Sequence, residues 1–166
     1  MSESVVTRDA VVLSLGANLG DAADTLANAI EALGSVEGLE ITDVSPTYRT
    51  AAVGGPEQPD YLNVVVLAST TLTPLDLLDA TSAIEQAAGR TREVHWGPRT
   101  LDIDLIVVGD QTRSTERLTL PHPRAHERAF VLLPWLDVDP RATIPGLGPV
   151  VELIAHVQDQ RADRVA

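Results

Sequence analysis

Hydrophobic and polar positions change their period along the chain, and this change predicts alternating strands and helices. Apolar residues at three- and four-residue spacing predict helices from Asp24 to Gly34 and from Thr73 to Gly89. Pro46 indicates an edge position or a bulge in one of the strands. Short runs rich in β-branched residues predict buried strands at residues 10–15, 39–50, 61–70 and 101–109.

The second of these helices has the clearest boundaries. Thr73 is the expected N-cap, Pro74 suits the first helical position, and Gly89 ends the pattern. Two further helices are expected, from about His126 to Leu136 and from Val150 to about Gln158. This order predicts an α+β protein with a ferredoxin-like sandwich, in which a βαββαβ antiparallel sheet carries helices on one face and a C-terminal helical extension follows.

Composition limits the classes of function. A chain of 166 residues with 44% hydrophobic content is expected to form one domain, 1–166, with residues 1–8 as a loose lead-in. Its net charge of −12 argues against nucleic acid or an anionic membrane as a partner. Without cysteine it has no thiolate metal site and no cysteine nucleophile. No basic leader and no apolar run of roughly 20 residues occurs, so we expect a cytoplasmic protein, and we expect a monomer.

Two carboxylates, Asp102 and Asp104, stand at alternate positions near the start of the last predicted strand. Alternation assigns even-numbered residues 100–108 to one face and the apolar odd-numbered residues 101–107 to the other, which puts the two Cα atoms about 6.5 Å apart. Such a pair can be the solvent-exposed start of a strand. It can also bind Mg²⁺, which prefers hard oxygen ligands and completes its shell with water and phosphate oxygens, or carry two ions that bridge a polyphosphate.

Nearby cations favour the metal and phosphate interpretation. Arg90, Arg92 and Arg99 make the stretch before the aspartates cationic in a chain that is acidic overall. A guanidinium presents a planar fork of donors that suits phosphate oxygens. The common phosphate loops are missing, because Gly16 and Gly20 in "GANLGD" match neither the dinucleotide fingerprint nor a P-loop and are explained by a strand-to-helix turn. An ATP site would therefore use another scaffold.

Three of the five aromatic residues lie beside loops where a ligand could bind. Tyr61, Trp96 and Phe130 could stack on a planar ring, although each could also be a core or rim residue. Asn63 shares a strand face with Tyr61 and could hydrogen-bond the edge of such a ring. These residues predict a site for a flat, polar-edged molecule.

His122 and His126 have the spacing of a helical metal pair. Pro121 and Pro123 flank the first histidine, so the two are not expected to share a helix, and a zinc site is disfavoured. His122 is then a contact to an anion or a nucleotide, or an ordinary loop residue.

Five segments together resemble the hydroxymethyl-dihydropterin pyrophosphokinase family, folate-pathway enzymes that move pyrophosphate from ATP to a pterin alcohol. They run in the family's order from near residue 10 to near residue 136. "WGPRTLDIDLI" followed by "LPHPR" is the most specific part. The segments are "LSLGANLGD", "YRTAAVGGPEQPDYLN", "IEQAAGRTR", "WGPRTLDIDLI" and "RLTLPHPRAHERAFVLLP".

The resemblance implies a role for each matching position. Asp102 and Asp104 would hold magnesium, as two ions together with ATP, and Arg90 and Arg99 would be catalytic beside them. The pterin hydroxymethyl oxygen would attack the β-phosphorus of MgATP, and AMP would leave. The implied pterin-binding residues are Thr50, Val53, Tyr61, Asn63, Trp96 and Phe130. The implied ATP-binding residues are Glu85, Arg92, Arg117, Thr119, His122 and Arg128.

The residue pattern by itself leaves two other functions open. A different metal-dependent transferase, such as a nucleotidyltransferase, would also use two strand aspartates, but it would release pyrophosphate in place of AMP. A regulatory module that binds a small molecule would bind its ligand without turnover.

Overall fold

The computed structural model describes residues 8–18, 21–50, 60–88 and 101–165. The first two thirds of the chain contain β1 (Asp9–Ala17), α1 (Ala22–Gly34), β2 (Leu39–Val44), β3 (Tyr48–Thr50), β4 (Tyr61–Thr70), α2 (Pro74–Ala87) and β5 (Asp102–Val108). The remainder contains β6 (Arg113–Ser114), β7 (Thr119–Leu120), the 3₁₀ turn η1 (Ala125–Glu127), α3 (Ala129–Val138), β8 (Thr143–Ile144), β9 (Gly148–Pro149), α4 (Val150–Leu153), η2 (Ile154–Val157) and β10 (Asp163–Arg164). The strand expected over residues 39–50 is thus two strands, interrupted around Pro46.

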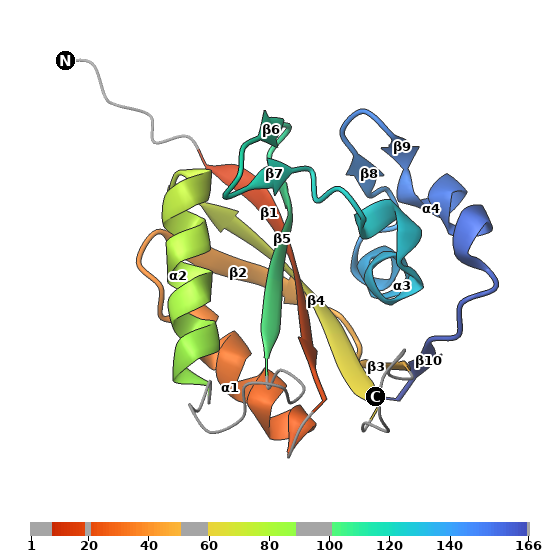
Figure 1. Cartoon of the computed structure of the whole chain (residues 1–166), viewed down its shortest axis with the longest axis horizontal. Helices are drawn as coiled ribbons and strands as arrows, with labels where there is room; N and C mark the ends of the chain where they lie inside the picture. Colours follow the sequence, from red (N-terminus) through yellow and green to blue (C-terminus); the bar gives the residue numbers. More distant parts are fainter. Residues whose placement is uncertain (1–7, 19–20, 51–59, 89–100, 166) are drawn as a thin grey trace.

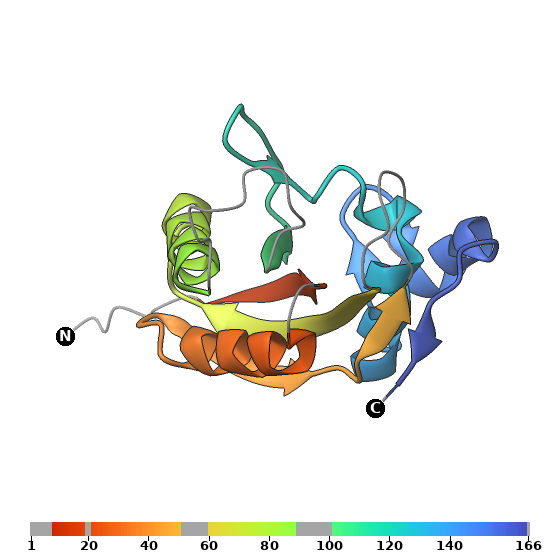
Figure 2. The same ribbon diagram turned by 60° about the horizontal axis from the view of Figure 1, so that its bottom comes forward.

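The main sheet has six antiparallel strands with β4 and β1 at its centre (Figure 1). β4 pairs with β1 on one side and with β2 and β3 on the other, and β5 pairs with the far edge of β1. β10 adds to β3, and Figure 2 shows this last, blue strand beside the orange one. The antiparallel βαββαβ arrangement confirms the predicted ferredoxin-like α+β class.

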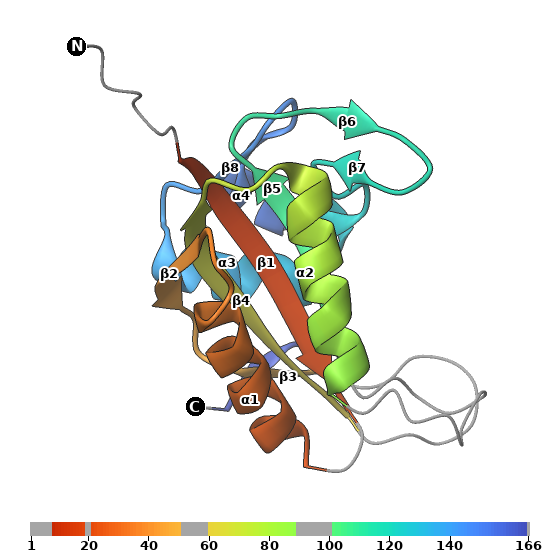
Figure 3. The ribbon, with the colours of Figure 1, turned by 90° about the vertical axis from the view of Figure 1, so that its left-hand side faces the viewer.

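Helices cover both faces of this sheet (Figure 3). Leu26 and Leu33 of α1 and Leu77 of α2 pack on one face and close the first core. Leu132 and Trp135 of α3 pack on the other face, together with residues of α4 and η2, and close a second core. The extension predicted at the C-terminus is therefore a second helical layer. No helix within the described ranges has both the length and the apolar character that crossing a bilayer requires.

The start of α2 follows the sequence prediction. The Asp76 backbone N–H donates to Oγ1 of Thr73 at 3.1 Å, and Pro74 occupies the first helical position. Thr73 therefore caps the helix as expected, because its hydroxyl accepts from one of the N–H groups that lack a partner inside the helix.

A bulge in β5 corrects one sequence-based assignment. The register between β1 and β5 shifts between Val12 and Leu13, which leaves Ile106 as an extra residue. Val107 therefore packs into the α3-side core and Val108 into the α1–α2 core. The strict alternation predicted beyond residue 105 is wrong, whereas the two aspartates precede the bulge and share one face.

Candidate active site

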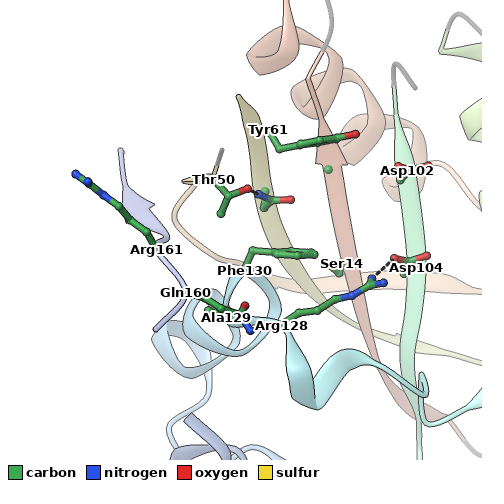
Figure 4. A pocket seen from close by; sticks show the side chains of 12 residues that line it. Ser14, Thr50, Tyr61, Asp102, Asp104, Arg128, Ala129, Phe130, Gln160 and Arg161 are labelled. Carbon is green, nitrogen blue, oxygen red and sulfur yellow. Dashed lines mark hydrogen bonds and ion pairs between the residues drawn. The ribbon is translucent and has the colours of Figure 1, made fainter. Parts of the chain in front are cut away.

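A cavity of about 560 Å³ lies between the sheet and the beginning of α3 (Figure 4). The sheet side is lined by Ser14, Gly16, Thr50, Tyr61, Asn63, Asp102 and Asp104. The opposite side is lined by Arg128, Ala129, Phe130, Gln160 and Arg161. A concave space of this size with a few convergent polar groups is typical of a small-molecule site.

Strand register explains why the polar residues of the sheet converge. Ser14 of β1 lies opposite Asp104 of β5, and Gly16 lies opposite Asp102. On the other side of β1, Gly16 lies opposite Asn63 of β4. Directly opposite residues of an antiparallel pair share a face, so these side chains form one continuous patch across three strands.

Gly16 makes room for the side chain of Asn63. A Cβ at Gly16 would lie 2.9 Å from Oδ1 of Asn63, closer than side chains pack. Asn63 is only 4% exposed, and its Nδ2 donates to Oγ1 of Thr50 at 3.0 Å. The interpretation of this glycine as a turn residue is therefore wrong: Gly16 belongs to β1, and the missing side chain lets Asn63 lie over the strand. Gly20 falls outside the described residues.

Two basic side chains approach the Asp104 carboxylate. One guanidinium nitrogen of Arg128 lies 3.7 Å from Oδ2 of Asp104, and Nε2 of His122 lies 4.0 Å from the same oxygen. Asp104 keeps 40% of its side chain exposed, so it remains accessible to a further ligand. The cavity therefore combines carboxylate oxygens with a cation that can face phosphate oxygens.

The surroundings of His122 favour the neutral form of its imidazole. Burial is the largest influence and lowers its pKa below the ordinary value, Arg128 and Arg124 lower it further, and Asp104 opposes them. The Arg124 backbone N–H donates to Nδ1 of His122 at 3.1 Å. In the neutral ring the proton is then on Nε2, the atom that faces Asp104, so His122 presents a donor at this end of the cavity.

The donor set suits magnesium better than zinc. Within the described part of the chain, no group of three or more His, Asp or Glu side chains comes close enough to hold a metal ion. Asp102 and Asp104 offer carboxylate oxygens, which are hard ligands, on one strand face with the cavity beside them. This arrangement fits an ion that takes its remaining ligands from water and substrate oxygens.

Two rings border the other end of the cavity. Figure 4 shows Tyr61 of β4 and Phe130 of α3 on opposite sides, with Thr50 near them. The guanidinium carbon of Arg128 lies 5.6 Å from the centroid of the Phe130 ring. A planar ligand could stack in this slot, and the polar groups of Thr50 and Asn63 lie at its side.

Seven of the residues assigned to the site from the sequence meet at this cavity, and His122 lies next to it through Asp104. Five other assigned residues, Val53, Arg90, Arg92, Trp96 and Arg99, lie outside the described residues. The seven are Thr50, Tyr61, Asn63, Asp102, Asp104, Arg128 and Phe130.

Besides His122, three residues implied for ATP are not among those that line the cavity. Glu85 of α2 accepts the backbone N–H of Ile103 at 2.7 Å, which caps the outer edge of β5. Arg117 is more than half exposed and pairs with Asp79 at 2.6 Å. Thr119 belongs to the short β6–β7 ribbon.

The sequence interpretation missed five residues of the lining, which are Ser14, Gly16, Ala129, Gln160 and Arg161. Ser14 had a usable signal, since it is a polar residue inside an apolar strand and is only 4% exposed. Gln160 and Arg161 carry no signal, because the polar C-terminal stretch gives no indication that it returns to the start of α3.

The family model of 7,8-dihydro-6-hydroxymethylpterin-pyrophosphokinase (HPPK) matches residues 12–140. The chain is 44% identical to a 2-amino-4-hydroxy-6-hydroxymethyldihydropteridine pyrophosphokinase of Synechocystis sp., a match that covers 88% of this chain and 75% of that protein. It is 39% identical to the protein of the same name from Pseudomonas aeruginosa, over 93% of this chain and 96% of the relative.

Solved structures show the same fold. Wild-type HPPK-DHPS of Plasmodium falciparum, crystallised with pterin and p-hydroxybenzoate, matches with a TM-score of 0.73 at 14% identity. The match covers 98% of this chain and 47% of the Plasmodium chain, so this chain spans about half the length of that solved protein.

The family match runs from β1 to just beyond α3 and includes every cavity residue except Gln160 and Arg161. The resemblance inferred from the five sequence segments is confirmed, and the chain belongs to the 7,8-dihydro-6-hydroxymethylpterin-pyrophosphokinase family.

Proposed function

We propose that this chain transfers pyrophosphate from MgATP to the hydroxymethyl group of 6-hydroxymethyl-7,8-dihydropterin, releasing AMP, as a step of folate biosynthesis. Family membership and the names of the relatives support the reaction. The observation that carries it in this chain is a single cavity that joins a ring-stacking slot to a pair of carboxylates. A pterin alcohol that receives phosphates needs both features within one molecule's length.

The slot suits the pterin ring. Tyr61 and Phe130 would stack on its two faces, since they border the cavity from opposite walls. Asn63 and Thr50, already joined by a hydrogen bond, would contact the polar edge of the ring. Val53 and Trp96 complete the proposed pterin-binding set.

The carboxylate end suits the triphosphate. Asp102 and Asp104 would hold two Mg²⁺ ions, which supply positive charge to the phosphate oxygens. Arg128 faces Asp104 and would contact the phosphates together with His122. We also assign Arg90 and Arg99 to catalysis and Glu85, Arg92, Arg117 and Thr119 to ATP binding.

The reaction needs orientation and charge compensation but no protein nucleophile. The hydroxymethyl oxygen bonds to the β-phosphorus as the bond between that phosphorus and the α,β-bridging oxygen breaks, so the β- and γ-phosphates leave together on the pterin. The hydroxyl proton is lost, and AMP takes the bridging oxygen. Arginines beside the transferred group stabilise the charge that develops on its oxygens.

A nucleotidyltransferase or a binding module without turnover is not favoured by any feature of the cavity. A nucleotidyltransferase would direct the attack to the α-phosphorus and release free pyrophosphate.

We further propose a cytoplasmic, monomeric, single-domain protein with no nucleic-acid or membrane partner. The net charge of −12 supports the absence of a polyanionic partner.

The test is product analysis with purified protein, MgATP and 6-hydroxymethyl-7,8-dihydropterin. Chromatography of the adenine nucleotides should show AMP accumulating one-to-one with the pterin diphosphate. Reactions without the pterin or without magnesium are the controls and should produce neither compound. Formation of ADP or free pyrophosphate, or binding of both substrates without turnover, would contradict the proposal.

A further inference from the structure

The side-chain amide of Gln160 bridges the backbone on both sides of Arg128. The Ala129 backbone N–H donates to Oε1 of Gln160 at 2.9 Å, and Nε2 of Gln160 donates to the carbonyl oxygen of Glu127 at 2.6 Å. Gln160 also lines the cavity, more than thirty residues further along the chain (Figure 4). A distant segment thus fixes two consecutive peptide units beside the site.

This bridge replaces a local helix cap. Arg128 is the N-cap residue of α3, with φ −123° and ψ 108°, and its own side chain makes no capping hydrogen bond. The first N–H groups of a helix have no acceptor within the helix, and a Ser, Thr, Asp or Asn at the N-cap usually supplies one. Gln160 supplies it here, and the side chain of Arg128 extends to Asp104.

The two peptide units determine how the start of α3, which lines the side of the cavity opposite the sheet, faces the sheet. Arg128 and Phe130 lie on either side of Ala129, whose N–H is the bridged donor. Arg128 comes within 3.7 Å of Asp104 and lies over the ring of Phe130. A rotation of these peptide units would move the cation and the ring together.

The segment that carries Gln160 is itself attached to the sheet. Beyond it, β10 pairs with β3, with Asp163 opposite Arg49 and Arg164 opposite Tyr48. The Val165 N–H donates to the carbonyl oxygen of Thr47 at 2.9 Å. Residues 160–165 therefore connect the start of α3 to the strand that ends in a cavity residue, Thr50.

We propose that Gln160 is a positioning residue of the pyrophosphoryl transfer, which holds Arg128 and Phe130 at the distances that phosphate and pterin require. This inference rests on the function proposed above for the cavity. Gln160 acts through the backbone of residues 127–129, so its loss should change substrate binding and turnover of a chain that remains folded. A contact that only stabilised the fold would change the melting temperature and leave the kinetics of folded enzyme unaltered.

The experiment compares two substitutions with a matched control. Gln160→Met keeps the length of the side chain and removes both hydrogen bonds. Gln160→Glu keeps an acceptor for Ala129 but loses the donor to Glu127. Gln158→Met changes an exposed glutamine two residues earlier, whose side chain makes no hydrogen bond with any described residue.

Steady-state kinetics should distinguish the three variants. The measurements are made at a temperature at which circular dichroism shows that every variant is folded. Gln160→Met should lower kcat/KM about tenfold and raise the KM for the pterin, because misplacement of binding groups is costly even when it is small. Gln160→Glu should lose less, and Gln158→Met should match the wild type. Hydrogen exchange of the Ala129 amide should be faster in Gln160→Met.

Wild-type kinetics in folded Gln160→Met would overturn the proposal, as would an equal loss in Gln158→Met. Failure of both Gln160 variants to fold would make the residue structural and overturn it as well. Calorimetric titration with the pterin separates this proposal from the proposed function. A wild type that binds the pterin but forms no AMP would refute the reaction, while weaker binding by Gln160→Met would still support the positioning role.

Discussion

The two walls of the cavity are held by different kinds of contact. The sheet wall places its polar groups by strand register, so that Asp104, Ser14 and their neighbours follow from backbone pairing. The opposite wall begins at Arg128 and is held by side chains from distant segments. Gln160 binds the start of α3, and the Tyr48 hydroxyl donates to Oδ2 of Asp137 near its end at 2.5 Å.

The two walls should therefore differ in how far they can move. A ladder of backbone hydrogen bonds cannot move one residue without moving its neighbours, so the sheet wall is the rigid reference for the proposed metal and phosphate site. The α3 wall can shift when a single side-chain contact is lost. Loss of a carboxylate from the sheet wall should therefore lower turnover far more than loss of a single contact that anchors α3.

The largest effect is expected from the carboxylates of the sheet wall. Asp102→Ala and Asp104→Ala should each lower kcat on the order of 10³-fold, because each removes a proposed magnesium ligand and the charge compensation that would depend on it. Rates of AMP formation across a magnesium titration measure this. Asp110→Ala, in the exposed turn after β5, is the matched control. Wild-type kcat in either cavity variant at saturating magnesium would show that the pair is not the metal site.

A smaller effect is expected from filling the space above β1. Gly16→Ala places a Cβ 2.9 Å from Oδ1 of Asn63, so Asn63 must move and its contact with Thr50 is strained. We expect pterin affinity to fall about tenfold, with about 1–3 kcal/mol lost from the free energy of unfolding. Calorimetry and urea unfolding measure the two effects.

Gly34→Ala is the control for that substitution. Its Cβ would meet only Cδ1 of Ile41, at an ordinary 3.9 Å, and Gly34 lies at the end of a helix. Alanine there should leave pterin affinity unchanged and be neutral or slightly stabilising. Equal affinities for Gly16→Ala and Gly34→Ala would mean that the position of Asn63 does not matter for the pterin.

Elements with local sequence signals could be predicted, whereas features that depend on contacts between distant segments could not. β4 and α2 have strong local signals, a β-branched run and a capped start with proline, and both have the predicted bounds or nearly so. The bulge at Ile106 has no local signal, because it is defined by the register with β1. Nor could periodicity show that the C-terminal helices cover the second face of the sheet.

For the candidate site, the placement of residues at the cavity was predictable where the residues follow from one strand or one motif. Asp102 and Asp104 share a face by alternation, and Tyr61 and Asn63 do the same on β4. Gln160 could not be found in this way, because its two contacts join residues 31 and 33 positions apart and depend on the folded path of the chain. The sheet wall was thus largely predictable, and the contacts that hold the α3 wall were not.

The smallest effect is expected from the second anchor of α3. Tyr48→Phe removes the hydroxyl that binds Asp137, so we expect about 1 kcal/mol lost from the free energy of unfolding. Turnover should change little, because Gln160 still holds the end of α3 that lines the cavity. Urea unfolding at neutral pH measures the loss, and a large fall in kcat would contradict the assignment of site geometry to the Gln160 end.

The pH dependence of the free energy of unfolding provides a second test of the hydrogen bond between Tyr48 and Asp137. Burial, together with the hydrogen bond to Asp137 and the charge of Asp137, raises the pKa of Tyr48 from its ordinary 10.0 to about 12, while Arg164 opposes them. Because the folded chain holds this proton more tightly than the unfolded chain, the stabilisation is complete below pH 10 and is lost as the pH rises towards 12. Wild type should therefore lose more stability than Tyr48→Phe between these two values. Parallel unfolding curves for both proteins would show that the tyrosine proton does not couple β3 to α3, and the α3 wall would then depend on Gln160 and packing alone.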